Sequence, residues 1–270
     1  MNIRAIAFDL DDTMLRDDRT LSAFTVTVLR KAAELGVKII PASGRARNSI
    51  RPFVDQIGCA ACYIACNGAE IWNPAHESLQ RLLFPDAVAQ RIIAFARENG
   101  SYAQTYAGDQ FYYMVENDYA VAYASASLLK GEFTPGMEGF IAAHPTCKIL
   151  VMDDERKIAR MLTEAKVRFA GEAAVTCSKS YFLEFNPPEA TKGNALAACG
   201  KLLGFDLSEA LAFGDSLNDL SMLETAGLGV AVANAREDVR ARVRAVCGSN
   251  EEDGPAHFIC EQLDIMETLL

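Results

Sequence analysis

The 270-residue sequence has no excess of basic residues and few histidines, and it has only one tryptophan. Lysine and arginine number 26 against 36 aspartates and glutamates, a formal net charge of −10. Nucleic-acid binding requires a basic surface, and the one basic cluster (Arg236, Arg240, Arg242 and Arg244) is interleaved with acids in the manner of a solvated helix face. The composition argues against a nucleic-acid partner, although local basic side chains can still receive a small anionic metabolite.

Long apolar runs are also missing. No uncharged stretch approaches the roughly 18 residues that a membrane span needs, and the short apolar run before Asp9 is typical of a strand rather than a leader. We therefore expect a cytoplasmic protein that has no membrane partner. No heptad run or internal repeat indicates an assembly, so a monomer or a homodimer is expected.

Eight cysteines are present, and Cys59-Ala-Ala-Cys62, followed by Cys66, has the spacing of a metal or redox motif. No histidine or second Cys-x-x-Cys pair lies nearby, and the segment is typical of a buried strand. We expect reduced cysteines that serve as small core residues. The isolated His76, His144 and His257 are not expected to be ligands.

The apolar run that begins at Ile3 ends in two carboxylates, Asp9 and Asp11. The carboxyl end of a buried parallel strand opens into the crevice where α/β sheets bind ligands. There, one acid can act as a nucleophile or metal ligand while the other transfers a proton. A solvated acidic loop is the alternative for this pair taken alone.

A second acidic cluster follows the apolar run that begins at Leu211. Asp215 stands at the expected strand end, and Asn218 and Asp219 open a predicted helix that Gly227 stops. Acids from two strand ends suit a hard, oxygen-loving cation, and the small number of direct ligands favours Mg²⁺ over Ca²⁺.

Two further segments suit a phosphate. Ser43 and Gly44 end a third apolar strand, where the hydroxyl and the free backbone N–H groups can face an oxyanion. Thr191-Lys192-Gly193 opens another helix and supplies a cation for the charge of the transition state. Taken singly, Ser43 is equally explained as a capping residue and Lys192 as a surface lysine.

Together and in this order, the four segments resemble the motifs of the haloacid dehalogenase superfamily, in particular its Cof-type branch of phosphohydrolases. The motif residues are Asp9-Leu10-Asp11-Asp12-Thr13, Ser43-Gly44-Arg45, Lys192-Gly193 and Gly214-Asp215-Ser216-Leu217-Asn218-Asp219, and the ending resembles that branch at Val232-Ala-Asn234-Ala235, Asn250, Asp253 and Gly254. Two positions depart from the branch pattern: Asp12 stands where glycine is usual and Ser43 where threonine is usual.

The resemblance implies a role for each matching residue. Asp9 would attack phosphorus and become an aspartyl-phosphate, and Asp11 would protonate the leaving alcohol and then deprotonate water. Mg²⁺ would be held by the carboxylate of Asp9, the backbone carbonyl of Asp11 and the carboxylate of Asp215. Asn218 or Asp219 would fix Asp215 or a metal-bound water without binding the ion directly. Lys192 would hold Asp9, and Ser43, Gly44 and Lys192 would bind the phosphate. The implied substrate is a small phosphorylated metabolite, such as a sugar phosphate or a phosphorylated cofactor.

The length exceeds the common single-domain range of roughly 100 to 150 residues. All four motifs lie outside the middle third, so we expect a Rossmann-like, doubly wound α/β core from residues 1–82 and 187–270 with an inserted α+β domain at 83–186. The resemblance implies that this insertion is a C2-type (class IIB) cap.

Periodicity predicts the elements around the motifs. In the core these are helices over 21–35 and 48–57 and a hairpin whose two strands, 63–66 and 70–72, are joined by Asn67-Gly68. In the insertion they are helices over 85–98 and 153–166 and strands over 102–106, 111–115, 148–152 and 181–185, with another near 175.

The insertion offers two sets of specificity candidates. One is the aromatic cluster of Tyr102, Tyr106, Phe111, Tyr112 and Tyr113, for which cross-strand packing is the favoured explanation. The other comprises Met137, Glu138 and Lys179 on expected loops.

Two other functions compete with hydrolysis through Asp9. Phe213-Gly-Asp-Ser216-Leu217 also resembles the nucleophile block of GDS-type serine esterases, with Ser216 as nucleophile, but Asp253 and His257 are spaced one residue too far apart for that family's base. A phosphomutase or phosphotransferase on the same fold is the second alternative. A phospho-accepting receiver domain is disfavoured, because Asp11 would hasten loss of the phosphoryl group.

Overall fold

The computed structural model describes residues 2–108 and 110–268 of the chain. Its first sheet contains five parallel strands in the order β14-β13-β12-β1-β2. Their bounds are β1 (Ala5–Phe8), β2 (Lys38–Pro41), β12 (Ala210–Gly214), β13 (Leu228–Ala231) and β14 (Ala245–Val246). Two segments far apart in the sequence, β1 and β12, thus lie side by side, and the predicted parallel α/β core is confirmed.

Helices cover both faces of this sheet. Strand side chains alternate between faces, so Ile6 and Phe8 join a core beneath α1, α2 and α10, whereas Ala5 and Ala7 join a second core beneath α7, α8 and α9. The helices are α1 (Ala23–Glu34), α2 (Arg47–Ile57), α7 (Lys192–Leu203), α8 (Leu220–Thr225), α9 (Glu237–Arg240) and α10 (Gly254–Leu263). The sheet is therefore doubly wound, as expected.

A small antiparallel sheet, β3-β4-β5, continues the core beside β2. The predicted hairpin is present as β3 (Tyr63–Ala65) and β4 (Glu70–Trp72), joined through a 3₁₀ turn, η2 (Cys66–Gly68). A third strand, β5 (Ser78–Arg81), was not predicted, because its side chains are mostly exposed and give it no apolar alternation.

The middle of the chain forms a second sheet of six strands in the order β10-β11-β9-β6-β7-β8. Neighbouring strands are antiparallel except β7 and β8, which a crossover through α4 makes parallel. The strands are β6 (Tyr102–Ala107), β7 (Gln110–Tyr113), β8 (Lys130–Phe133), β9 (Ile149–Met152), β10 (Ala174–Thr176) and β11 (Phe182–Asn186).

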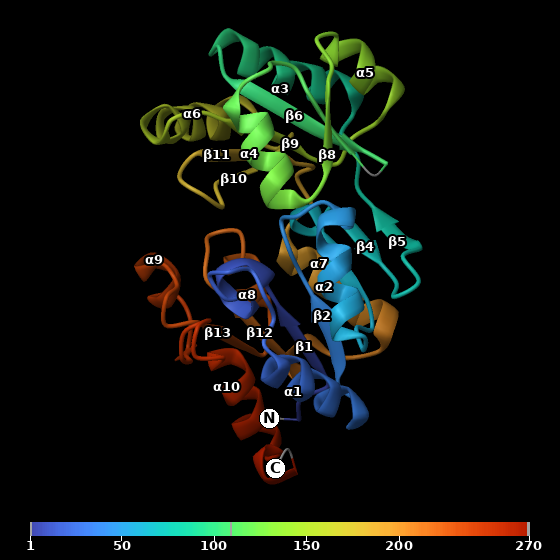
Figure 1. The fold of residues 1–270 in the computed structure, drawn as a ribbon, viewed down its shortest axis with the longest axis vertical. Helices are drawn as coiled ribbons and strands as arrows, with labels where there is room; N and C mark the ends of the chain where they lie inside the picture. Colours follow the sequence, from blue (N-terminus) through green and yellow to red (C-terminus); the bar gives the residue numbers. More distant parts are fainter. Residues whose placement is uncertain (1, 109, 269–270) are drawn as a thin grey trace.

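Helices also cover this second sheet. One face packs against α3 (Asp86–Glu98), α5 (Met137–Ala143) and α6 (Glu155–Arg168), and the other against α4 (Asp118–Ser127). The second sheet and its helices lie beyond one end of the parallel sheet, so the molecule has two lobes (Figure 1). Among the described residues, no helix combines the length and the apolar character needed to cross a bilayer.

Candidate active site

The acidic motif begins where β1 ends. The backbone N–H of Asp9 donates to Phe213 O over 3.0 Å, so the parallel ladder between β1 and β12 continues to the first carboxylate. The chain then turns through a short π-type segment, η1 (Leu10–Met14), in which Asp12 has a φ of 58°. This turn separates the partners of the two acids: Asp9 pairs with Lys192, and Asp11 pairs with Arg45.

Lys192 is a buried cation between two carboxylates. Its Nζ lies 2.5 Å from Asp9 Oδ1 and 2.5 Å from Asp219 Oδ1. Burial would lower the pKa of Lys192, but the charges of Asp219 and Asp9 outweigh it and raise that pKa above its ordinary value. Lys192 is thus no surface lysine. The carboxylates of Asp9 and Asp219 compensate its positive charge inside the site.

Local sequence explains how Lys192 reaches this position. Thr191 caps α7 by accepting the N–H of Asn194 at 3.1 Å, which makes Lys192 the first residue of the helix. Gly193 then allows α7 to approach α8 closely, since an added Cβ would lie 2.3 Å from Ser221 O. The Thr-Lys-Gly segment therefore works as a unit that delivers the ammonium group to the strand ends.

Asp215 lies at the carboxyl end of β12. Its Oδ1 accepts from Thr13 Oγ1 at 3.0 Å and its Oδ2 from Ser216 Oγ at 2.7 Å. Burial and the neighbouring charge of Asp219 raise the pKa of Asp215 to about 7. Burial likewise raises the pKa of Asp9 well above its ordinary range, although Lys192 opposes the shift. The cluster carries more negative charge than Lys192 balances.

These carboxylates fit a cation. Oxygen atoms of Asp9, Asp215 and Asp219 all lie within 4.8 Å of one another, and all three residues are buried. Both carboxylate oxygens of Asp219 accept hydrogen bonds. Its Oδ1 accepts from Lys192, and its Oδ2 accepts from the N–H groups of Asp215 and Ser216 at 3.1 and 3.0 Å. The all-oxygen donor set and the surplus negative charge suit Mg²⁺.

Ser43 and Gly44 follow β2 and line the same pocket as the acids. The Ser43 hydroxyl accepts the N–H of Arg45 at 3.2 Å, so it holds the local turn in the way expected of a capping residue. Gly44 O accepts from Lys148 Nζ at 2.6 Å, which ties the turn to the second sheet. The structure thus brings Ser43, Gly44, Asp9 and Asp215 to one cavity, although they come from three separate strand ends.

Arg45 is a site residue for which we predicted no separate role. Its Nε donates to Asp11 Oδ2 over 2.7 Å and its Nη2 to Asp11 Oδ1 over 2.6 Å. Burial alone would raise the pKa of Asp11, but the hydrogen bonds and charge of Arg45 lower it below its ordinary value. The only sequence signal for this pair is the position of Arg45 directly after Ser43-Gly44.

Asn218 has a different neighbour from the one we expected. Its Nδ2 donates to Asn67 Oδ1 over 3.1 Å, whereas the hydroxyls of Thr13 and Ser216 hold Asp215. Asn67 in turn donates to Glu184 and Asn186, both at 3.2 Å. This chain of amides joins the fourth motif to β11 of the second sheet.

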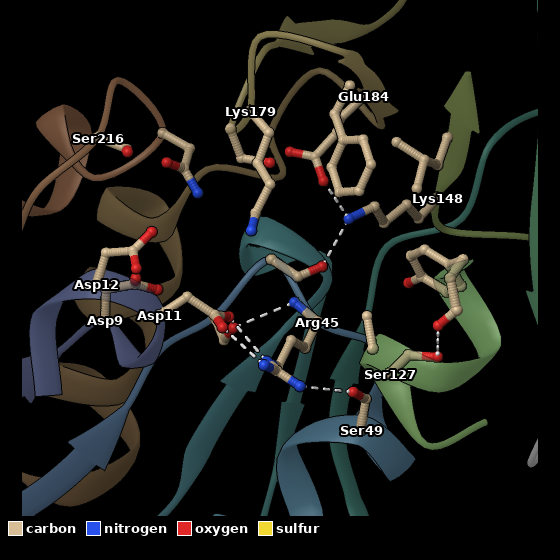
Figure 2. A pocket seen from close by; sticks show the side chains of 18 of the residues that line it. Asp9, Asp11, Asp12, Arg45, Ser49, Ser127, Lys148, Lys179, Glu184 and Ser216 are labelled. Atoms are coloured by element: carbon tan, nitrogen blue, oxygen red, sulfur yellow. Dashed lines mark hydrogen bonds and ion pairs between the residues drawn. The ribbon is translucent and has the colours of Figure 1, made fainter. Parts of the chain in front are cut away.

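Both sheets contribute to a cavity of about 130 Å³ above the acids (Figure 2). The second sheet and its helix α4 supply Tyr123, Lys148, Tyr181, Phe182 and Glu184, and Lys179 reaches toward Asp11 from the loop before β11. Arg19 lines the cavity from the core. Because these contacts depend on how the two lobes are placed, the sequence singled out only Lys179 among them.

The other specificity candidates lie outside the cavity lining. Met137 is buried in the core of the second lobe, and Glu138 pairs with Arg97 at its surface, 2.9 Å away. The aromatic cluster is used for packing: Tyr106 faces Phe111 across the β6–β7 ladder, and the Tyr102 and Tyr113 rings stack with centroids 6.0 Å apart. Phe111 also belongs to a buried cluster with Ala46 and Ala69 of the core.

An esterase triad is not formed around Ser216 in the described part of the chain. The Ser216 hydroxyl donates to Asp215, and the ring of His257 packs against Phe24 of α1 with centroids 4.7 Å apart. The remaining histidines bond elsewhere: His76 to Tyr63 and Asp55, and His144 to Phe140 O. Ser216 therefore has no neighbouring base of the kind a serine nucleophile needs.

Comparison with known proteins places this geometry in a family. Phosphatase YwpJ of Bacillus subtilis is 29% identical over 281 residues, spanning 95% of this chain and 99% of that protein. Pyridoxal phosphate phosphatase YbhA of Escherichia coli is 28% identical over 275 residues, spanning 97% and 100%. A solved haloacid dehalogenase-like hydrolase from Bacteroides thetaiotaomicron superposes with a TM-score of 0.85 at 29% identity, covering 97% of this chain and 99% of the other. Residues 6–259 match the haloacid dehalogenase-like hydrolases, and the chain belongs to that family.

Proposed function

We propose that the protein is a Mg²⁺-dependent phosphatase that hydrolyses a small phosphorylated metabolite through a phosphoryl group carried on Asp9. The observation that supports this most is the convergence of Asp9, Asp215 and Asp219 around Lys192, at the floor of a cavity that Ser43 also lines. A nucleophilic oxygen, a cation site and a hydroxyl donor for the phosphate thus lie at one place, and the names of the relatives agree with phosphate ester hydrolysis.

In the first step, an Asp9 carboxylate oxygen forms a bond to phosphorus as the bond between phosphorus and the alcohol oxygen breaks. Asp11 gives its proton to the leaving alkoxide. In the second step, a water oxygen attacks the same phosphorus, Asp11 takes a proton from that water, and the bond to Asp9 breaks to release phosphate. Lys192 holds Asp9 in place throughout.

The Arg45–Asp11 ion pair suits the second step directly, because it favours the ionised carboxylate that accepts a proton from water. For the first step Asp11 must be protonated. A phosphate dianion arriving beside Asp11 raises the pKa of that carboxyl and competes for Arg45. Substrate binding would therefore prepare Asp11 to act as an acid.

Mg²⁺ would be held by the carboxylates of Asp9 and Asp215 and by the backbone carbonyl of Asp11, and it would supply positive charge to the phosphoryl oxygens. Asp219 would position the site through its hydrogen bonds with Lys192, Asp215 and Ser216. Thr13 and Ser216 would orient Asp215.

Residues 83–186 would act as the C2-type cap over a core of residues 1–82 and 187–270. The cavity lining contains Tyr123, Tyr181 and Phe182 together with the cations of Arg19 and Lys179. Such a lining suits the non-phosphate part of a sugar phosphate or of a phosphorylated cofactor. The similarity to a relative named as a pyridoxal phosphate phosphatase supports the cofactor class. A cytoplasmic location is consistent with the eight free cysteines.

An aryl phosphate assay with and without Mg²⁺ tests this proposal for wild type, Asp9→Asn and Ser216→Ala. We expect phosphate release that requires Mg²⁺, is lost in Asp9→Asn and persists in Ser216→Ala. Aryl acetate added in parallel tests the esterase, whose activity would have to be present and lost in Ser216→Ala. Phosphate transfer to an added alcohol without release of free phosphate would instead favour a phosphotransferase or a mutase.

A further inference from the structure

Two cysteines and a glutamate from separate parts of the chain meet at the boundary between the two lobes. Cys66 lies in the η2 turn, Glu70 begins β4, and Cys147 lies just before β9 of the second sheet. The two sulfurs and a carboxylate oxygen all lie within 4.8 Å of one another, and all three residues are buried. None of them lines the active-site cavity.

The backbones that carry the two cysteines are fixed to each other. Asn186 Nδ2 donates to Cys66 O over 2.9 Å and to Cys147 O over 2.8 Å. Asn67 holds that amide by donating to Asn186 Oδ1 over 3.2 Å. One side chain therefore holds together the two backbone segments that carry the thiols, so these segments are organised before any ligand arrives.

Glu70 is oriented in the manner of a carboxylate ligand. Arg81 Nε donates to its Oε1 over 2.9 Å, and Trp72 Nε1 donates to its Oε2 over 3.2 Å. Each carboxylate oxygen has a second lone pair that these bonds leave available. Hydrogen-bonding partners of this kind orient ligands and tune metal affinity.

We propose that Cys66, Glu70 and Cys147 form a second metal site, for a thiophilic divalent cation of the zinc class. The ion would join the core to the inserted lobe, and it would be separate from the all-oxygen site at Asp9 and Asp215. Thiolate ligands select such ions over Mg²⁺, and three protein ligands leave a fourth position for water.

The charges balance when the ion binds. The cation displaces one proton from each thiol, so M²⁺ and two thiolates carry no net charge and two protons are released. The carboxylate of Glu70 is already neutralised by Arg81. The site therefore buries no uncompensated charge, which is the main obstacle to placing an ion at a dry boundary.

A disulfide is the competing use of the same thiols, and the surroundings disfavour it. Both thiols are buried, so an oxidant reaches them less readily than it reaches an exposed thiol. A disulfide would also leave the position of Glu70 unexplained.

Cobalt absorption tests the proposal on the reduced, metal-free full chain under anaerobic conditions, because sulfur-to-Co²⁺ charge transfer appears only when thiolates bind the ion. We expect a near-ultraviolet band that saturates at one ion per chain and is bleached by Zn²⁺. The band should vanish in Cys66→Ser and in Cys147→Ser. In Glu70→Gln, Co²⁺ binding should weaken at least tenfold.

Cys199→Ser is the matched control. The Cys199 sulfur lies 3.3 Å from that of Cys62, also in a buried pair, and its loss should leave the band unchanged.

Asp215→Asn should also keep the band, which separates this site from the proposed Mg²⁺ site. Should a serine variant fail to fold, the stoichiometry and Zn²⁺ competition of the wild type still decide the matter. Reduced wild type without a sulfur band at stoichiometric Co²⁺ would overturn the proposal, as would a band that survives in folded Cys66→Ser. Recovery of a Cys66–Cys147 disulfide peptide from protein purified without reductant would assign the pair to redox chemistry instead.

Discussion

Arg45 forms a bidentate ion pair with Asp11: Nε donates to Oδ2 over 2.7 Å, and Nη2 donates to Oδ1 over 2.6 Å. The guanidinium is itself held, because Nη1 donates to Ser49 Oγ over 3.1 Å and the ring of Phe53 lies 5.2 Å from its central carbon. Both the position and the acid strength of the proposed proton carrier therefore depend on a residue of the second motif. Figure 2 shows the pair at the edge of the cavity.

Replacing Arg45 should change both the rate and its pH dependence. Arg45→Lys keeps the positive charge but loses the bidentate hydrogen bonds to Asp11, so we expect kcat to fall on the order of 10²-fold. In Arg45→Ala, the pKa of Asp11 rises because its cation is gone. When hydrolysis of the phosphoryl group on Asp9 limits turnover, Asp11 acts as the base, so the acidic limb of the kcat profile should then move to higher pH. An acidic limb that stays in place would contradict this role. Arg51→Ala, which changes an exposed arginine of the helix that follows Arg45, is the control.

Metal binding and apo stability should respond in opposite directions to Asp215→Asn. Burial raises the pKa of Asp215 to about 7, so its charged form destabilises the metal-free fold at neutral and higher pH, and an amide there should raise the melting temperature in chelator. The wild type should gain about 2.7 kcal/mol at a Mg²⁺ concentration of 100 Kd, and Asp215→Asn should gain little. Thermal unfolding with and without Mg²⁺ measures both effects. The exposed Asp86→Asn should shift neither curve, and equal Mg²⁺ gains in wild type and Asp215→Asn would refute the site.

The sequence was sufficient to predict the strand ends, because three of the four motifs follow a short apolar run and parallel strands align their carboxyl ends. The register in which Phe8 faces Phe213 then places Asp9 near Asp215 without any further information. The spacing of apolar residues also predicted helices: the observed bounds of α2 and α3 lie within one residue of the predicted ones. Local sequence patterns were thus enough to predict the core and to locate its four motifs.

Contacts between lobes were beyond prediction. The Asn67 amide chain and the aromatic lining of the cavity depend on how the two lobes meet, and no local periodicity encodes that. The Arg45–Asp11 pair lies within the core, but it depends on two side-chain conformations that local periodicity does not encode either. The cysteines illustrate the same limit. Spacing drew attention to Cys59 and Cys62, but the fold pairs Cys62 with Cys199 and brings Cys66 to Cys147.

Gly44→Ala should damage the phosphate turn through one steric contact. A Cβ on Gly44 would lie 2.8 Å from Asn67 Oδ1, and the bonds of Asn67 to Glu184, Asn186 and Asn218 prevent it from moving away. We expect a loss of about 1–3 kcal/mol in the free energy of unfolding and a raised KM for aryl phosphate. Gly139→Ala, on a helix with open space around the added carbon, is the matched control. Equal behaviour of the two variants would show that this contact is unimportant.

A buried ion pair within the second lobe also contacts the phosphate turn of the core. Lys148 Nζ lies 2.5 Å from Glu184 Oε1 and 2.6 Å from Gly44 O, and both charged side chains are 3% exposed. Burial would raise the pKa of Glu184, but the charge of Lys148 and the amide of Asn67 lower it below the ordinary value of 4.5. Glu184 therefore contributes stability that is present above pH 4.5 and is lost as the pH falls through its folded-state pKa.

Glu184→Gln should consequently destabilise the protein by about 3–5 kcal/mol at neutral pH, because it leaves the Lys148 ammonium buried without a counter-charge. The difference from wild type should shrink as the pH falls below 4.5, where wild-type Glu184 begins to take up its proton. Urea unfolding followed by circular dichroism at a series of pH values measures this. Adding Lys148→Met should restore most of the loss, since no unpaired charge remains. The exposed Glu98→Gln, which breaks a pair with Arg168 at the surface, should change stability little. A wild-type-to-Glu184→Gln difference that is constant from neutral pH to well below 4.5 would show that the charge of Glu184 is not what stabilises the fold.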